Sequence, residues 1–139
     1  MEERIFLQTS LKFWKNDRGI TVLSRGASGG IVTMWDNYKL DLITSKSCNH
    51  WIYTHLFKKD SGTQVCIFNI YAPVLFFYNK NCWDLLWEAA NELHLENNII
   101  VGDLNVVLNQ FEKRGGSVVR DPIREWVDEL ILDWDLTDI

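Results

Sequence analysis

The hydrophobic pattern of the first half of the chain predicts short strands separated by turns. Its apolar runs are rich in β-branched and aromatic residues, and several alternate with polar positions, which is typical of strands. Residues 1–16 predict a short helix ahead of them. Segments rich in Asn, Asp or Gly predict turns at residues 16–19, 36–37 and 58–62. We therefore expect a meander of antiparallel strands at residues 20–24, 31–35, 40–44, 51–57 and 65–71.

The second half of the chain contains two segments with the period of an amphipathic helix. The first is predicted at residues 81–94, with Asn81 as its N-cap; the second begins at Asp121 as N-cap, with Pro122 in the first helical position. Their apolar stripes would be formed by Trp83, Leu86, Trp87, Ala90, Leu93 and His94, and by Ile123, Trp126, Val127, Leu130, Ile131 and Trp134. Acidic residues spaced four apart on the first helix predict a solvated opposite face. Both helices are thus expected to cover a sheet.

A short apolar run, Asn98–Val101, lies between the two helices and predicts a buried strand. Four residues are too few for a helix, and the sequence Ile-Ile-Val favours the β conformation. We expect Gly102 to end this strand and residues 136–139 to begin another one. Strands that alternate with helices predict an α/β fold, in which the strands lie inside and the helices outside.

Asp103 and Asn105 follow this strand at the place where open α/β sheets hold ligands. Two residues apart in an extended chain, a carboxylate and a carboxamide would point the same way, which suits a hydrated metal ion or a phosphate. The alternative is a turn, in which both side chains bond the nearby backbone. Tyr71, at the end of strand 65–71, also has two interpretations: a half-buried aromatic residue with a solvated hydroxyl, or a phenol that donates to a phosphate oxygen.

Length and composition bound the class of protein. A chain of 139 residues is expected to form one domain, and 47% hydrophobic residues, with 13% aromatic ones, exclude a disordered chain. The apolar runs are too short to cross a membrane, and the start of the chain lacks a secretory signal pattern. We therefore expect a soluble, intracellular protein. Three cysteines without a close pair predict neither a disulfide framework nor a zinc knuckle.

Charge is distributed unevenly along the chain, whose net charge is −5. Residues 1–83 hold ten basic and six acidic residues, whereas residues 84–139 hold four basic and thirteen acidic ones. Non-specific binding of nucleic acid requires a clustered basic surface. Only the first half could supply such a surface. The acidic half would repel a polyanion unless a divalent metal ion or further parts of a larger protein intervened.

Four motifs occur in a fixed order along the chain. They are Gly26-Ala-Ser-Gly-Gly-Ile31 through Met34-Trp35-Asp36, Phe68-Asn-Ile-Tyr-Ala-Pro73, Val101-Gly-Asp-Leu-Asn-Val106 and Glu112-Lys-Arg-Gly-Gly-Ser117. Each is weak alone, but the ordered combination is specific. It resembles the endonuclease domain of plant LINE-type non-LTR retrotransposons, within the endonuclease/exonuclease/phosphatase superfamily that shares the deoxyribonuclease I fold. The resemblance covers nearly the whole chain.

The resemblance implies a four-layer α/β sandwich, in which two packed mixed sheets are flanked by helices. It also implies Mg²⁺-dependent hydrolysis of phosphodiester bonds, with DNA as the substrate. Asp103 matches the aspartate that orients or deprotonates the attacking water and serves as the metal residue of the predicted site. Asn105 matches the asparagine that holds a phosphate oxygen, and Tyr71 matches the tyrosine that contacts the scissile phosphate. A metal ion and fixed donors would neutralise the charge of the pentacovalent state.

Several groups of that family have no match in this chain, among them a metal-binding asparagine and glutamate near the start and an aspartate and the catalytic histidine near the end. Residues 1–139 are therefore expected to form a single domain that is truncated at both ends and incomplete. We expect this chain alone to be an inactive fragment, with weak or no binding of DNA. The alternative is a non-catalytic binding or interaction module that keeps only the α/β scaffold.

Overall fold

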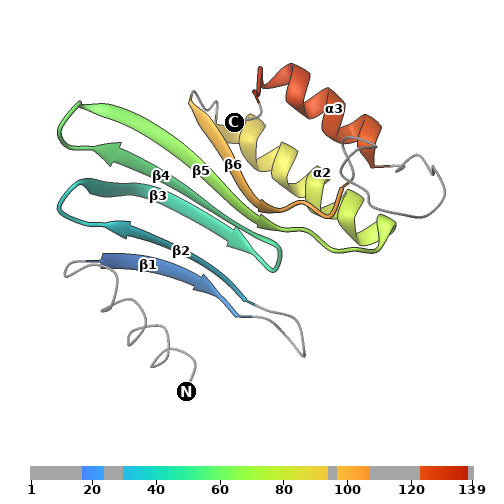
Figure 1. Ribbon diagram of the computed structural model, residues 1–139, viewed down its shortest axis with the longest axis horizontal. Coiled ribbons are helices and arrows are strands. Elements are labelled where there is room, and N and C mark those ends of the chain that lie inside the picture. Colours follow the sequence, from blue (N-terminus) through green and yellow to red (C-terminus); the bar gives the residue numbers. More distant parts are fainter. Residues whose placement is uncertain (1–16, 24–29, 94–96, 107–122, 138–139) are drawn as a thin grey trace, which may run out of the picture.

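Two β-sheets and two helices make up the part of the chain that the structure, a computed structural model, describes: residues 17–23, 30–93, 97–106 and 123–137 (Figure 1). The first sheet is the antiparallel pair of β1 (Asp17–Val22) and β2 (Ile31–Asp36). The second has the order β3-β4-β5-β6, formed by β3 (Leu40–Cys48), β4 (Trp51–Lys58), β5 (Thr63–Tyr71) and β6 (Asn98–Asp103). The helices are α2 (Phe76–Leu93) and α3 (Arg124–Asp133).

The four-stranded sheet is mixed. Strands β3, β4 and β5 form the predicted antiparallel meander. Strand β6 instead runs parallel to β5, because helix α2 lies between them in the chain and returns it to the same end of the sheet. The register pairs Cys66 with Asn98 at one end and Tyr71 with Asp103 at the other. Two strands therefore deliver their carboxyl ends, side by side, to one edge of the sheet.

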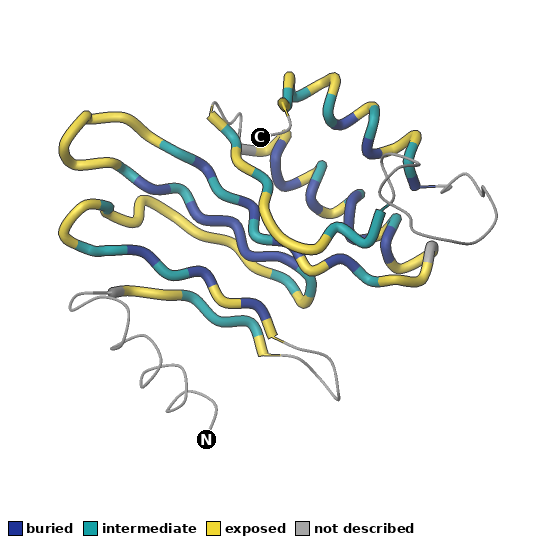
Figure 2. The backbone as a smooth tube through the Cα atoms, viewed as in Figure 1, coloured by how far each residue is buried: buried dark blue, intermediate teal, exposed yellow. Residues whose placement is uncertain are grey.

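Alternation along β5 sends successive side chains into two different layers. Phe68 and Ile70, each at most 1% exposed, belong to one buried cluster with residues of α2 and α3. Asn69 points the other way, and its amide donates hydrogen bonds to the carbonyl oxygen of Val32 (2.9 Å) and the hydroxyl of Thr33 (3.1 Å), both in β2. The four-stranded sheet thus lies between the helices and the β1-β2 pair. Figure 2 shows the resulting run of buried positions along β4 and β5.

Aromatic residues fill the space between the sheet and the helices. The ring of Phe68 lies 4.9 Å from that of Tyr53 in β4 and 5.8 Å from that of Trp134, which follows α3. Trp134 in turn stacks on Trp87 of α2 at 6.2 Å. These rings join β4, β5 and both helices into one core, as the apolar stripes of the two helices predict.

The fold class predicted from the sequence, α/β, is confirmed. The described residues form three of the four expected layers, and only the four-stranded sheet is mixed, since the β1-β2 pair is antiparallel. Most strand ends lie within two residues of the prediction, and two strands are extended further. β1 begins at Asp17, within the predicted turn 16–19, and β3 continues beyond Thr44 to Cys48. In both cases the added residues pair with a neighbouring strand, β2 or β4, and for β1 this pairing overrides the predicted turn.

The prediction for the start of the first helix was wrong. Helix α2 begins at Phe76, five residues before the predicted start, so Asn81 is an exposed position inside the helix and not its N-cap. The backbone N–H of Asn79 already donates to the carbonyl of Leu75 (2.9 Å). The early start is hidden in the sequence because Phe77 and Tyr78 are exposed and break the amphipathic pattern.

Two expectations about β6 were also wrong. The strand does not end at Gly102, since Asp103 still pairs with Tyr71. Nor is it fully buried: Ile99 is 39% and Val101 43% exposed. The reason is that β6 is an edge strand of the four-stranded sheet within the described residues, so one side has no neighbour.

The ends of the second helix differ from prediction as well. Ile123 takes the N-cap position of α3, two residues later than expected. At the other end, the N–H groups of Asp135 and Leu136 donate back to the carbonyls of Leu132 (3.2 Å) and Ile131 (2.9 Å), and Asp135 has a φ of +50°. This pattern is a Schellman cap, so Leu136 closes the helix and does not begin a strand.

Some expectations fall on residues outside the described ranges. They are the helix at 1–16, residues 26–29 of the first motif, the helix end at His94, the motif at 112–117, the predicted cap residues Asp121 and Pro122, and residues 138–139. Neither α2 nor α3 is both long enough and apolar enough to span a membrane.

Candidate functional site at the carboxyl ends of β5 and β6

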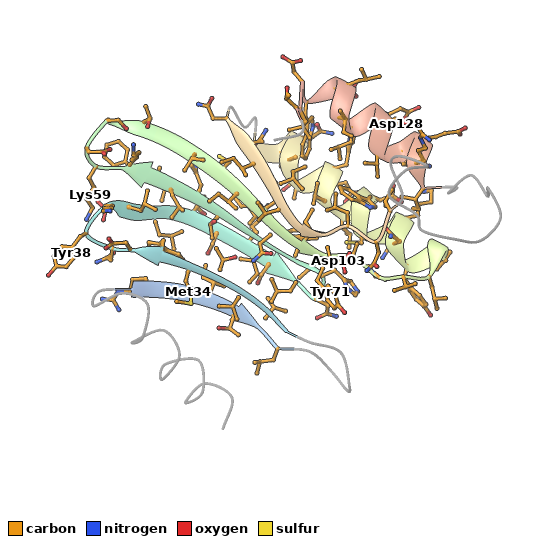
Figure 3. The ribbon with its side chains drawn as sticks, in the orientation of Figure 1. Met34, Tyr38, Lys59, Tyr71, Asp103 and Asp128 are labelled. Atoms are coloured by element: carbon orange, nitrogen blue, oxygen red, sulfur yellow. The ribbon has the colours of Figure 1, made fainter. Side chains whose placement is uncertain are left out.

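Tyr71 and Asp103 lie side by side at the ends of two parallel strands. They are register partners, so their side chains leave the sheet on the same face, and Figure 3 shows them next to each other at one end of the sheet. The backbone N–H of Ala72 donates to the carbonyl of Asp103 (2.8 Å), and that of Tyr71 donates to the carbonyl of His50 (2.8 Å). Both side chains reach solvent, and Tyr71 is 40% exposed.

Asp103 and Asn105 form a turn. The backbone N–H of Asn105 donates to Asp103 Oδ1 (3.0 Å), and Asn105 has the left-handed φ of +47°. The backbone at residues 103–105 therefore forms the turn that was the alternative prediction. The expectation that these residues are extended was wrong. An Asx turn uses only one carboxylate oxygen. The other oxygen of Asp103, Oδ2, has no hydrogen-bond partner among the described residues and faces solvent.

Asn105 ties this turn to the end of β5. Its side-chain amide donates a short hydrogen bond to the carbonyl oxygen of Ala72, directly after Tyr71. The three predicted site residues are thus brought to one rim, connected through the backbone of Ala72. The amide nitrogen of Asn105 holds the turn against β5 through this bond. The amide oxygen of Asn105 has no hydrogen-bond partner among the described residues.

Asn79, which the sequence analysis did not identify, stabilises the turn at residues 103–105. Asn79 in α2 is 1% exposed, and its amide donates to the carbonyls of Leu104 (3.3 Å) and Asn105 (3.2 Å). Its position, four residues before Trp83 and seven before Leu86, places a polar side chain in the apolar stripe of the helix. That polar interruption was the available signal, but the helix was expected to begin only at Asn81.

Gly102 fixes the distance between the two strands at the site. Its φ is +120°, and a Cβ atom built there would lie 2.0 Å from the carbonyl oxygen of Ile70, its register partner in β5. Real side chains never approach a backbone oxygen so closely. A glycine is therefore required for the strands to bring Tyr71 and Asp103 together.

A cavity of about 900 Å³ opens along β6 beside this rim. Asp103, Leu104 and Asn105 line one end, and residues 134–137, after α3, line another part. Tyr71 does not line it. Two of the three candidate site residues, Asp103 and Asn105, thus belong to the lining of this cavity.

The rim offers few ligands for a metal ion. No group of three or more His, Cys, Asp or Glu side chains gathers within the described ranges, and Asp103 is the carboxylate at the rim. Mg²⁺ keeps several waters and is often held by one or two carboxylates together with substrate phosphates. The free oxygen of Asp103 fits one such bond, but not a complete protein cage.

Comparison with known proteins identifies the fold through structure, whereas comparison of sequences identifies no family. No family model and no curated protein matches the chain. Among solved structures, the chain is similar to an endonuclease/exonuclease/phosphatase family protein from Bacteroides thetaiotaomicron, with a TM-score of 0.56 and 17% identity over 72% of this chain and 46% of the other.

Two further solved structures match in the same way. The human Nocturnin catalytic domain with bound sulfate has a TM-score of 0.53 and 17% identity, over 72% of this chain and 46% of that one. A mannosyl-6-phosphatase from Bacteroides thetaiotaomicron has a TM-score of 0.57 and 17% identity, over 75% of this chain and 49% of that one. The fold is therefore the one found in endonuclease/exonuclease/phosphatase family proteins, and this chain spans about half the length of the structures it matches.

Proposed function

We propose that residues 1–139 are part of a Mg²⁺-dependent phosphodiesterase domain of the endonuclease type, in which Tyr71, Asp103 and Asn105 contact the phosphate group of DNA. The observation that carries this proposal is the pairing of Tyr71 with Asp103 at the carboxyl ends of β5 and β6, where the two strands present a phenol and a carboxylate on one face.

The matched structures support a phosphate ester as the ligand class. One of them holds a sulfate ion, which has the shape and charge of a phosphate, and another is a phosphatase acting on a phosphorylated sugar. Both share the fold of this chain. A tetrahedral anion as the ligand is the common feature that we transfer to this protein.

The proposed roles follow from the chemistry of each side chain. The exposed phenol of Tyr71 donates a hydrogen bond to a phosphate oxygen. Asp103 holds a Mg²⁺ ion or the attacking water through its free carboxylate oxygen, and the metal supplies positive charge to the phosphate. Asn105, anchored on Ala72, keeps the turn in place and offers its amide oxygen to the water or the metal.

Binding of DNA in the presence of Mg²⁺ tests this proposal. Fluorescence anisotropy of a labelled short duplex should report weak binding that requires Mg²⁺ and is lost in Asp103→Asn. This variant keeps an oxygen that accepts the Asn105 N–H, so the turn is preserved. Asp128→Asn removes an exposed carboxylate of α3, far from the rim in Figure 3, and is the matched control. Equal effects of the two substitutions would contradict the proposal.

We further propose that this chain alone does not cleave DNA. Asp103 is one carboxylate, whereas the proposed metal-assisted attack on a phosphodiester needs a firmly bound metal and an acid for the leaving oxygen. Purified chain should nick supercoiled plasmid only at the background rate, unchanged by Asp103→Asn. Clear Mg²⁺-dependent nicking that this substitution abolishes would overturn the inactive-fragment view.

The proposed origin is a LINE-type retrotransposon, and it rests on the order of the four motifs in the sequence. Elements of that type leave many copies in a genome. The expected observation is therefore a set of dispersed loci that encode the same motif order. A single locus without related copies would count against this origin.

A further inference from the structure

A second cavity lies on the helical side of the molecule, in the surface between α2 and α3. Its volume is about 270 Å³, and its lining consists of two tryptophans and three carboxylates: Asp84, Trp87, Glu88, Trp126 and Glu129. None of these five residues lines the cavity along β6, and none belongs to the rim formed by Tyr71, Asp103 and Asn105. The cavity is therefore separate from the candidate phosphodiesterase site.

The chain itself shows which ligand chemistry this surface accepts. The ammonium nitrogen of Lys80 lies 4.1 Å from the centre of the Trp126 ring and 2.9 Å from Asp84 Oδ2. A tryptophan face attracts a cation through its negative π cloud, and a neighbouring carboxylate adds direct charge attraction. Trp126 and Asp84 both line the cavity and both already contact an ammonium group.

The remaining lining residues are free to bind a second cation. Glu88 and Glu129 are exposed and form no ion pair within the described part of the chain. Trp87 is held in place, since its ring stacks on Trp134 at 6.2 Å. The unpaired carboxylates of Glu88 and Glu129 and the fixed indole of Trp87 thus offer negative and aromatic groups to a cation.

The charge of the whole helical surface favours a cationic partner. Helices α2 and α3 together carry seven acidic and two basic residues. Both basic residues are already paired within their own helix, Lys80 with Asp84 and Arg124 with Asp128. A nucleic acid would be repelled from this surface, whereas a basic polypeptide would be attracted to it.

We propose that this cavity binds, beside Lys80, the side chain of a lysine or arginine from a basic polypeptide segment, against Glu88 and Glu129 and in contact with the indoles of Trp87 and Trp126. The volume is just below the range of about 300–1,000 Å³ that is typical of small-molecule sites, so it suits one side chain. This interaction is independent of the proposed phosphodiesterase function.

A pair of peptides that differ in one charge tests the proposal. The first probe is a capped pentapeptide with one lysine between glycine and alanine residues, and the second carries norleucine in place of the lysine. Titration of ¹⁵N-labelled chain followed by NMR should shift the indole N–H signals of Trp87 and Trp126 with the lysine peptide only. Equal shifts with norleucine would show a purely apolar cavity and overturn the proposal.

Variants of the lining separate this site from the rest of the surface. Trp126→Ala should weaken binding of the lysine peptide about fivefold, the loss expected for one partly exposed cation–π contact. The double variant Glu88→Gln, Glu129→Gln retains the core and should weaken binding by a similar factor. Leu132→Ala, at a 78% exposed position of α3 outside the cavity, should leave affinity unchanged.

Two results would contradict the proposal. One is binding of the lysine peptide that Trp126→Ala and the double glutamine variant both leave intact, because the peptide would then bind elsewhere. The other is a short DNA duplex that shifts the two indole signals while the lysine peptide does not. Loss of DNA binding in Asp103→Asn has no bearing on this cavity, so the two proposals fail independently.

Discussion

Strands β5 and β6 run side by side in the same direction, yet they differ sharply in burial. In β5, Phe68 and Ile70 are at most 1% exposed. In β6, Ile99 and Val101, which share the face of Asn69, are 39% and 43% exposed although both are apolar and β-branched, whereas Ile100, on the face of Phe68, packs partly buried against the core. The difference lies in what covers each strand, since β5 has neighbours on both sides and layers on both faces.

The comparison distinguishes the formation of a strand from its burial by neighbouring layers. An apolar, β-branched run determines that a segment becomes a strand, but its coverage depends on segments far away in the chain. Asn69 in β5 is bonded to β2, so the two-stranded sheet lies over β5. No such bond joins β2 to Val101, the register partner of Asn69 in β6, among the described residues. The candidate site lies where a strand covered on both faces and a strand covered on one face end together.

Replacing Gly102 with alanine is expected to have the largest effect, because it breaks the contact between these two strands. The new Cβ atom would meet the backbone oxygen of Ile70 at 2.0 Å, at a φ of +120° that alanine rarely adopts. We expect a loss of more than about 3 kcal/mol in the free energy of unfolding. Urea denaturation followed by far-UV circular dichroism measures this loss. Gly62→Ala provides a milder control, since its φ of +68° is also positive but nothing lies within 4 Å.

Truncation of one side chain in each strand sharpens the comparison. Phe68→Ala should destabilise the fold by about 3–5 kcal/mol, because it leaves a cavity within the aromatic cluster. Val101→Ala should cost less than about 1 kcal/mol, since much of that side chain is already in water. Equal losses in denaturant unfolding would mean that β6 is covered as well as β5.

Removal of the buried amide beneath the turn should have an intermediate effect that is concentrated at β6. Asn79→Ala leaves the carbonyls of Leu104 and Asn105 without their donor, at a cost of about 1–3 kcal/mol. Asn81→Ala changes an exposed residue of the same helix and should alter stability by less than about 0.5 kcal/mol. Hydrogen exchange should increase at residues 103–105 in Asn79→Ala more than within β5.

The smallest expected effect is a dependence of stability on pH that arises from buried groups of the core. Burial raises the pKa of the Tyr53 hydroxyl and of the Cys66 thiol, which share a hydrogen bond, and raises the pKa of Cys82 to about 12. These groups deprotonate first in the unfolded chain, so their contribution is complete below about pH 9 and is lost as the pH rises toward their folded-state values. Urea unfolding at pH 8 and pH 10.5 should show lower stability at the higher pH, with a smaller decrease in Cys82→Ala.

Much of the fold and part of the candidate site could be predicted from the sequence. Alternating apolar residues locate the strands, and the position of Asp103 after an apolar run places it correctly at the rim beside Tyr71. The direction of the Asp103 side chain could not be obtained in this way, because a left-handed Asn105 and a hydrogen bond to its N–H replace the extended chain. The role of Asn79 depends on packing between α2 and the end of β6, which no local pattern encodes.

The central claim is that the ends of β5 and β6 form one binding site for a phosphodiester and Mg²⁺. The most direct measurement is an NMR titration of ¹⁵N-labelled chain with a thymidine dinucleotide in the presence of Mg²⁺. The account predicts that the amide signals of residues 71–72 and 103–105 shift together, and that Asp103→Asn removes these shifts while leaving the remaining spectrum unchanged. Shifts confined to other parts of the chain, or unaltered by Asp103→Asn, would contradict it.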